Sequence, residues 1–327
     1  SPGSADFLES CGIWPLLPQS RLCRVERMQI SGDDGRSRLD FSAYDAGLRE
    51  LAFIAENRLL QRAAWQRLGE AEHVRIFSPA RCASAAWCGD HASLMLQDGT
   101  ALAARLLVGA DGAGSWLRTQ AGIAVKPRDY GQLGVVANFA AAKPHQGVAY
   151  QWFRRDGVLA LLPLPGDQVS MVWSTAEPHA HELLALAPQD LGVAVNQASC
   201  GALGDLRLLA PPLGFPLRMQ RVENIVKSRT ALVGDAAHSV HPLAGQGVNL
   251  GFRDAFGLAQ VLGARGAQSD CGDYDLLRRY ERARREDILA VQFMTDMLQK
   301  LFGNDTVWLA RVRNMGLRLV DGQPQLK

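Results

Sequence analysis

The chain has 327 residues, of which 47% are hydrophobic and 21% charged, a balance typical of a globular protein. Its formal net charge of +2 gives no electrostatic case for binding nucleic acid. Basic residues cluster over 278–285, which we interpret as a solvated helix face rather than a binding patch. Six scattered cysteines lack metal-ligand spacing, so we expect no metal site and reduced thiols. The sequence has no signal peptide and no apolar run near the ~20 residues that are needed to span a bilayer, so we expect a cytoplasmic protein.

The first third of the chain predicts two helices, a short strand and a β-meander. Residues 5–10 resemble the continuation of a helix that has begun before them, and no initiating Met precedes them. We therefore expect a segment upstream. An apolar strand is expected over 50–55, followed by a helix from about Asn57 to Arg67 with its inner face formed by Leu59, Leu60, Ala63 and Ala64. The meander is expected to have strands at 73–77, 93–96 and 105–109, the last typical of a strand buried on both faces.

Residues 130–220 alternate short strands with Pro/Gly turns, which predicts a mostly antiparallel sheet in a second domain. A helix around 178–200 interrupts strands that are expected at 134–139, 148–153, 158–162 and 169–173. A second buried strand at 230–235, a helix from near Gly247 and a helical tail over 275–318 complete the chain. We therefore predict an α/β fold of the α+β kind, with a Rossmann-like domain interrupted by a sheet domain.

Two strand-to-loop junctions carry the chemistry. The strand at 105–109 leads into Asp111 and Gly112, and the strand at 230–234 leads into Asp235 and a glycine-rich loop that opens the helix at Gly247. In open α/β sheets ligands bind at the carboxyl ends of strands, and free N–H groups at a helix start stabilise an anion. The first junction alone is a weak signal, since Asp-Gly after a strand is often just a turn. The second is far more specific.

These segments resemble the DG and GD motifs of single-component flavoprotein aromatic hydroxylases, the para-hydroxybenzoate hydroxylase fold group. The sequence HPLAGQGVNLGF at 241–252 is most similar to the FAD-dependent hydroxylases of ubiquinone biosynthesis, the UbiH/UbiI type. The similarity extends over nearly the whole chain, including Glu56-Asn57, Phe215-Pro216-Leu217 and Arg279-Tyr280-Glu281-Arg282. It implies an FAD-binding domain at 1–125 plus 225–270, a substrate-binding sheet domain at 126–224 and a C-terminal helical region at 271–327. Within the first range, residues 15–50 are expected to contribute to the substrate domain.

The resemblance also assigns cofactor contacts. Asp235, after Gly234, is expected to hydrogen-bond the ribityl chain of FAD, where a carboxylate suits a polyol. The backbone N–H groups of Gly247, Val248 and Asn249 are expected at the flavin N1–C2=O edge, which holds negative charge in reduced flavin. The pyrophosphate region is assigned to Asp111 and Gly112. Asn57 stands where many relatives carry an arginine that touches the dinucleotide.

The catalytic assignment falls on the loop before the 247 helix. The resemblance implies that Pro242, with its neighbours His241 and Gly245, lines the flavin face at which oxygen reaches the substrate. His238 and His241 flank this loop, and both a base role and a structural role stay open for them.

One part of the family pattern is missing. Relatives open with a strand, a GxGxxG turn, a helix and an acidic residue for the ribose, whereas the glycine triplets here have the wrong spacing. Because dinucleotide affinity draws on that unit, we expect FAD in the full-length protein and none retained by this chain alone.

The expected function is hydroxylation of a polyprenylated phenol in ubiquinone biosynthesis by an FAD-dependent monooxygenase that uses NAD(P)H and O2. The side chains of Trp152, Phe153, Leu161 and Phe215 form either an apolar substrate wall or plain core. A lipid-soluble substrate predicts peripheral association with the inner membrane or with a quinone-biosynthesis complex. The alternatives are a flavin-free scaffold or lipid-binding member of such a complex, and another flavoprotein reductase or halogenase of the same fold.

Overall fold

The computed structural model describes residues 1–33, 37–240 and 245–302, which form two compact units. Unit 1 contains residues 1–70, 131–217 and the described residues from 297 on, and unit 2 contains 71–130 and 218–296. This division differs from the predicted domain bounds, because residues 1–70 group with the sheet. Two long strands, β9 (Val125–Ala141) and β14 (Leu213–Val222), have residues in both units.

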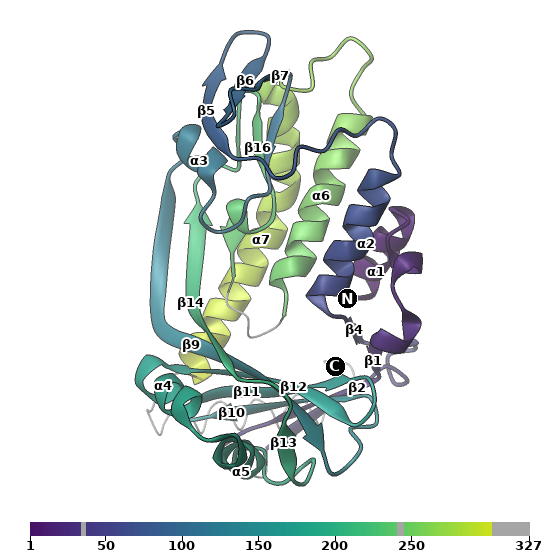
Figure 1. Ribbon diagram of the computed structural model, residues 1–327, viewed down its shortest axis with the longest axis vertical. Helices are drawn as coiled ribbons and strands as arrows, with labels where there is room; N and C mark the ends of the chain where they lie inside the picture. The colour runs from purple at the N-terminus through teal and green to yellow at the C-terminus, as the bar shows by residue number, and fades with distance from the viewer. Residues whose placement is uncertain (34–36, 241–244, 303–327) are drawn as a thin grey trace. The chain divides into compact units, whose positions relative to one another are not determined.

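A mostly antiparallel sheet forms the frame of unit 1 (Figure 1), which confirms the sheet predicted over 130–220. The strand order is β17-β14-β9-β12-β11-β10-β2-β3, with β13 also paired to β9. β2 pairs in parallel with β10 and antiparallel with β3, so residues 27–42 supply two strands of this sheet. The remaining bounds are β2 (Arg27–Ser31), β3 (Arg38–Ser42), β10 (Val148–Arg154), β11 (Gly157–Leu164), β12 (Gln168–Ala176), β13 (Leu206–Leu208) and, in unit 2, β17 (His238–Ser239).

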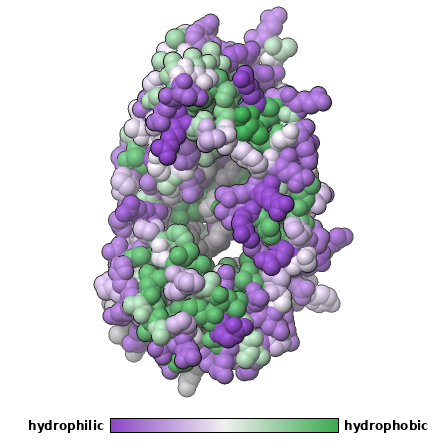
Figure 2. All heavy atoms as spheres, in the orientation of Figure 1, coloured by the Kyte–Doolittle hydropathy of each residue, from purple (hydrophilic) through white to green (hydrophobic). Residues whose placement is uncertain are grey.

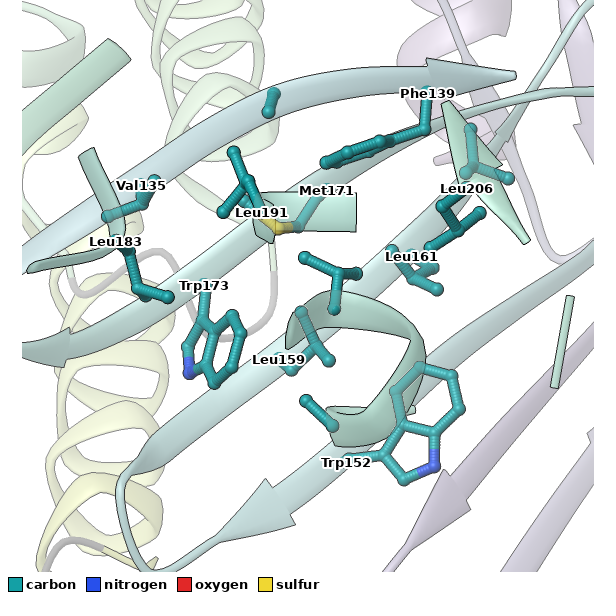
Figure 3. Packing of buried hydrophobic residues seen from close by; sticks show 14 of the residues in the cluster. Val135, Phe139, Trp152, Leu159, Leu161, Met171, Trp173, Leu183, Leu191 and Leu206 are labelled. Carbon is teal, nitrogen blue, oxygen red and sulfur yellow. The ribbon is translucent and has the colours of Figure 1, made fainter. Parts of the chain in front are cut away.

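The core of unit 1 lies between one face of this sheet and two helices, α4 (Glu177–Ala185) and α5 (Pro188–Ala198). Side chains alternate between the two faces along β11 and β12, and those of Leu159, Leu161 and Met171 are fully buried (Figure 3). Trp152 belongs to the same cluster. Four residues were expected to form either an apolar substrate wall or plain core. Trp152, Phe153 and Leu161 are core residues, whereas Phe215 is 52% exposed.

The helix predicted over 178–200 is in fact two helices. Proline lacks an N–H and fixes φ, so it fits the first turn of a helix and disrupts an interior. Pro188 accordingly begins α5 after α4 has ended at Ala185.

The N-terminal part of unit 1 agrees with the predicted elements. Helix α1 (Pro2–Ser10) and helix α2 (Asn57–Gly69) occupy the two expected places, and Ala63 is the buried residue of α2. Strand β4 (Ala52–Ile54) lies within the expected 50–55 and pairs antiparallel with β1 (Cys23–Val25). Two 3-10 turns, η1 (Trp14–Leu16) and η2 (Gln19–Arg21), connect α1 to β1.

Unit 2 contains two small sheets and two long helices. The order β15-β16-β8 makes one sheet and β5-β6-β7 the other, an antiparallel meander. Helices α6 and α7 lie beside β16 (Figure 1), and Leu258, Leu277 and Tyr280 pack with the strand residues in one core cluster. The bounds are β5 (Cys82–Trp87), β6 (Ala92–Leu96), β7 (Ala101–Ala104), β8 (Leu107–Gly109), α3 (Trp116–Gln120), β15 (Val226–Lys227), β16 (Thr230–Leu232), η3 (Gly234–Ala236), α6 (Gly247–Gly263) and α7 (Tyr274–Phe302).

Three expectations for unit 2 need correction. The predicted strand at 73–77 is irregular, because no described strand supplies backbone partners for it. The third strand of the meander is instead β5, whose alanines and serine have little tendency to form strands. The strand at 105–109 begins only at Leu107, and Val108 is 45% exposed, so this edge strand is not buried on both faces among the described residues. The helical tail is described to Phe302, and residues 303–318 lie outside the described chain.

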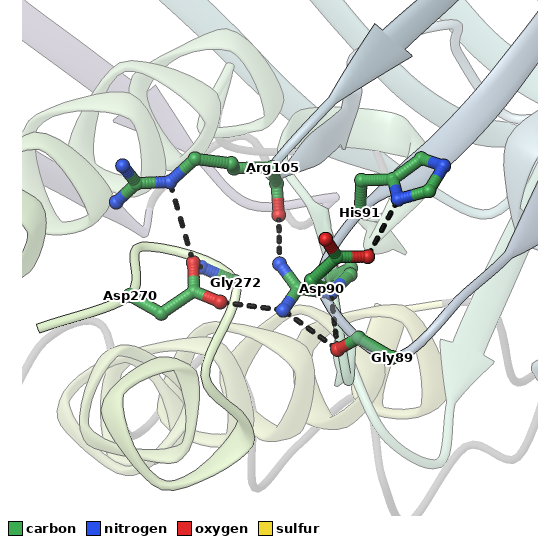
Figure 4. A network of polar contacts seen from close by, with 7 residues as sticks. Gly89, Asp90, His91, Arg105, Asp270 and Gly272 are labelled. Atoms are coloured by element: carbon green, nitrogen blue, oxygen red, sulfur yellow. Dashed lines mark hydrogen bonds and ion pairs between the residues drawn. The ribbon is translucent and has the colours of Figure 1, made fainter.

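A polar network joins four loops of unit 2 before the strands β8 and β16 begin (Figure 4). The guanidinium of Arg229 donates hydrogen bonds to the carbonyls of Gly89 (3.1 and 2.8 Å) and Arg105 (2.9 Å) and to the Asp270 carboxylate (2.5 Å). The Gly272 N–H donates to the same carboxylate at 3.0 Å. Arg229 and Gly272 together hold the pKa of Asp270 at about 2, below its usual 3.8.

No helix among the described residues is long and apolar enough to cross a membrane. Hydrophilic residues cover much of the visible surface, and hydrophobic residues form patches among these hydrophilic residues (Figure 2).

The depressed pKa of Asp270 predicts a defined pH dependence of stability. A carboxylate favoured by the folded state stabilises fully above its unfolded pKa near 4, and that contribution is lost as pH falls toward 2. We expect Asp270→Asn to lower the urea midpoint at pH 7, and its deficit relative to wild type to shrink between about pH 4 and 2. Glu72→Gln, at an exposed position without a described partner, should leave the midpoint unchanged. A deficit that is constant from pH 7 to 2 would contradict the assignment.

Candidate functional site

The two aspartates predicted from the strand ends lie at the same edge of one sheet. β8 and β16 pair in parallel, with Gly109 opposite Leu232. Asp111 follows the first strand by two residues and Asp235 follows the second by three. The carboxyl ends of neighbouring parallel strands form the crevice in which α/β proteins bind ligands. The structure therefore brings together the two loops that the sequence singled out.

The first loop turns at Gly112, whose φ of +79° suits glycine. The Asp111 carboxylate accepts a hydrogen bond from the Leu117 N–H at 3.0 Å, and the buried Ser115 hydroxyl accepts one from the Arg118 N–H at 3.0 Å. Both side chains thus cap the short helix α3. The predicted contacts of Asp111 and Gly112 with the cofactor pyrophosphate stay a prediction.

Arg118 joins this loop to the second one. Its side chain is 5% exposed and donates hydrogen bonds to the carbonyls of Ala113 (2.7 Å) and Ala236 (2.9 Å). Five donors in a planar fork allow one guanidinium to satisfy carbonyls on two segments at once. The sequence does not predict this role of Arg118, because an arginine in a short helix gives no signal of spacing or period.

The second loop begins with a tight turn at Gly234, whose φ is +59°. A Cβ at Gly251 would lie 3.4 Å from the Gly234 Cα, so two glycines allow α6 to approach the turn closely. Asp235 is exposed, and its carboxylate has no hydrogen-bond partner among the described residues. An unengaged carboxylate beside a tight backbone turn suits a ligand with hydroxyl groups.

Helix α6 presents its N-terminus to the same loop. Gly245 has a φ of +58°, and the N-cap residue Gln246 makes no side-chain cap hydrogen bond. The first N–H groups of a helix have no partner within it and carry partial positive charge, which favours an anion. The Asn249 side chain donates to the Gly245 carbonyl at 3.0 Å and so fixes the loop just before the helix. The residues present fit the negatively charged edge that reduced flavin would place at Gly247, Val248 and Asn249.

A buried carboxylate fixes the geometry of this loop. Asp254 on α6 is 0% exposed, and its Oδ2 accepts hydrogen bonds from the Gly234 N–H (2.9 Å) and pairs with His238 Nε2 (2.6 Å). Its Oδ1 accepts from Arg284 Nε of α7 at 2.8 Å. Burial alone would lower the pKa of Arg284, but the hydrogen bond and charge of Asp254 raise it. Three segments therefore converge on one carboxylate.

Helix α7 adds two further attachments to the strand region. The buried Tyr280 hydroxyl donates to the Leu232 carbonyl at 2.8 Å, and burial raises the pKa of this hydroxyl well above its usual value. The Glu281 carboxylate accepts from the Ile225 N–H at 2.8 Å. The segment Arg279-Tyr280-Glu281-Arg282, noted in the sequence, thus holds β16 and the residue just before β15.

The remaining predicted residues have separate positions. His238 is 2% exposed and engaged with Asp254, which is a structural role. His241 and Pro242 lie outside the described residues, so their catalytic assignment stays a prediction, as does that of Gly245. Asn57 is the exposed first residue of α2 in unit 1, and its cofactor contact also stays a prediction. No group of three or more potential metal ligands occurs in the described part of the chain.

Comparison with known sequences identifies relatives along the whole chain. A family model described as "FAD binding domain" matches residues 89–293. The ubiquinone hydroxylase UbiL of Rhodospirillum rubrum is 35% identical over 98% of this chain and 75% of its own length. The 3-demethoxyubiquinol 3-hydroxylase of Escherichia coli is 32% identical over 100% of this chain and 83% of its own length.

Solved structures share the fold. PqsL of Pseudomonas aeruginosa, crystallised with 2-aminobenzoylacetate, has a TM-score of 0.80 at 22% identity and matches 97% of this chain and 87% of its own. The p-nitrophenol 4-monooxygenase PnpA of Pseudomonas putida has a TM-score of 0.77 at 15% identity and matches 98% of this chain and 83% of its own. At these identities the likeness concerns the fold alone.

The buried carboxylate of Asp254 predicts a large effect of one substitution. Asp254→Asn removes the charge that partners Arg284 and His238, and breaking a buried pair costs about 3–5 kcal/mol. We expect a corresponding loss in the free energy of unfolding by urea. Asp287→Asn is the matched control, because it removes the 49% exposed second partner of Arg284. Its cost should be about 0–1 kcal/mol, and equal costs for the two variants would refute the role of Asp254.

Proposed function

We propose that this chain, which belongs to the family of FAD-dependent aromatic hydroxylases of ubiquinone biosynthesis, hydroxylates the ring of a polyprenylated phenol. Membership makes the chain a flavoprotein monooxygenase. The observation that carries the proposal is the turn at Gly234 and Asp235 beside the start of α6, where the N-cap residue Gln246 makes no side-chain cap hydrogen bond. We propose this turn as the flavin-binding place. The relatives named as ubiquinone hydroxylases match this chain through that turn and over nearly its full length.

The residues of unit 2 would bind and orient the cofactor. When bound, FAD supplies the redox chemistry that activates O2 for transfer of one oxygen atom. Asp235 would accept hydrogen bonds from the ribityl hydroxyls, and the N–H groups of Gly247, Val248 and Asn249 would stabilise negative charge at the flavin edge. Arg118 and Asp254 would keep the two loops in place without touching the cofactor. NAD(P)H is proposed as the reductant.

The sheet of unit 1 offers a surface for an apolar substrate. The face opposite α4 and α5 carries partly exposed side chains, and a pocket of about 260 Å³ opens there. Leu162 and Leu164 line it, together with Ile54 and the ion pair of Arg21 and Glu56. Asn138, Gln168 and Ser170 also line the pocket, so that polar and apolar residues contribute equally to it. Because such a substrate is lipid-soluble, the proposal includes peripheral association with the inner membrane or with a quinone-biosynthesis complex.

The cofactor assignment predicts weaker FAD binding in one variant. Asp235→Ala removes a charge-assisted hydrogen bond, worth about 1.5–3 kcal/mol, so the dissociation constant of FAD should rise roughly 10- to 100-fold. Fluorescence titration of FAD into the full-length apoprotein measures this constant. Glu286→Ala, an exposed carboxylate on α7, is the control and should leave it unchanged. Unchanged affinity in Asp235→Ala would remove Asp235 from the site, whereas a wild-type protein that binds no FAD would favour a flavin-free scaffold.

The substrate assignment predicts a specific metabolic lesion. Cells that lack this protein should accumulate an under-hydroxylated quinone precursor, detected by mass spectrometry of lipid extracts. Complementation with the wild-type gene should restore the quinone, and the Asp235→Ala gene should restore less. Normal quinone levels in the deletion strain would contradict the biosynthetic role.

A further inference from the structure

Unit 2 contains a second pocket that the flavin assignment does not use. Its volume is about 470 Å³, within the range of small-molecule sites. It lies between the end of β14, the loop that follows it and one face of α7. Its apolar part is formed by Val222, Ile225, Ile288 and Leu289. All of its lining residues belong to unit 2.

The polar lining is strongly basic. Five cationic residues line the pocket against two carboxylates, those of Glu223 and Glu281. Each carboxylate already has a partner: Glu223 pairs with Lys126 at 2.7 Å, and Glu281 pairs with Arg278 while accepting the Ile225 N–H. The pocket therefore keeps an excess of positive charge after internal pairing.

Three guanidinium groups carry this excess. Arg221, Arg282 and Arg285 are exposed, and their side chains have no ion pair or hydrogen bond to any described residue. Arg282 and Arg285 are three residues apart on α7 and thus lie on one face of the helix. Arg279 of the same helix is also exposed but does not line the pocket. The basic run over 278–285 is therefore not uniformly a solvated face, because its members separate into pocket and non-pocket positions.

One of the lining residues has a buried polar atom without a described partner. His238 is 2% exposed and belongs to the lining, and its Nδ1 makes no hydrogen bond to a described residue. Its other ring nitrogen is held by Asp254, so the ring is fixed in orientation. A buried ring nitrogen without a partner is costly unless something else satisfies it.

We propose that this pocket binds the phosphate or pyrophosphate group of an organic ligand. Guanidinium forks match phosphate oxygens in bidentate geometry, and the apolar wall would contact the organic part of the ligand. The phosphate would come either from a soluble nucleotide or from a lipid headgroup. The pocket lies apart from the Asp235 carboxylate and the α6 start, neither of which lines it. The proposal does not rest on the hydroxylation reaction.

Calorimetric titration of the flavin-loaded protein with inorganic pyrophosphate tests the site. Arg282→Gln/Arg285→Gln should weaken binding at least roughly tenfold, since each charge-assisted contact contributes on that order. Arg279→Gln removes the same charge from the same helix and should change the affinity less than about twofold. Equal melting temperatures of the variants establish that the exposed substitutions leave the fold intact.

A second arm identifies the source of the phosphate. The same proteins are sedimented with vesicles of phosphatidylcholine alone or with added phosphatidylglycerol, and titrated with a pyridine dinucleotide. Nucleotide binding that requires Arg282 and Arg285 supports a soluble ligand, and vesicle binding that requires them supports a lipid headgroup. Pyrophosphate, nucleotide and vesicle binding that are all unaffected by the double variant, or equally reduced by Arg279→Gln, would overturn the proposal.

Discussion

The carboxylate of Asp254 is the constraint on which the arrangement of unit 2 depends. It has no exposed surface, and its partners among the described residues are the Gly234 N–H, His238 and Arg284. A buried charge tolerates little displacement of its hydrogen-bond donors, because water cannot reach the carboxylate to replace a lost donor. Asp254 lies seven residues after Gly247, two helical turns or roughly 10 Å along α6. The position of the helix N-terminus is therefore fixed from within the core.

The loops before the parallel strands β8 and β16 differ from the loops after them in their polar contacts. Before β8 and β16 begin, Arg229 and Asp270 join the loops through short contacts that engage the carbonyls of Gly89 and Arg105. After the strands end, glycines turn the backbone and the Asp235 carboxylate stays unengaged. Both ends are thus held by polar contacts, but the groups available to a ligand lie beyond the carboxyl ends of the strands, where ligands bind in folds of this kind.

The predictable features were those with a local signal. Glycines and Asp235 after an apolar strand identified the second loop, and Gly247 was the predicted helix start that the structure has. The contacts of Arg118 and Asp254 are long-range and gave no such signal, although Asp254 stands at four-residue spacing between the buried Leu250 and Leu258. A carboxylate within an apolar stripe is the one pattern that could have identified it. The expected strand at 73–77 failed because strand formation requires a partner, which composition does not specify.

The environment of His238 decides a question that the sequence left open. A general base needs a ring nitrogen within reach of the substrate proton. In His238 one nitrogen lies 2.6 Å from the Asp254 carboxylate and the whole residue is 2% exposed. Using that nitrogen as a base would break its contact with Asp254, the carboxylate that also accepts the Gly234 N–H. The other nitrogen belongs to a residue that lines the basic pocket rather than to the Asp235 side of the turn. His238 is therefore a structural partner of Asp254, whose carboxylate also accepts the hydrogen bond from the Gly234 N–H.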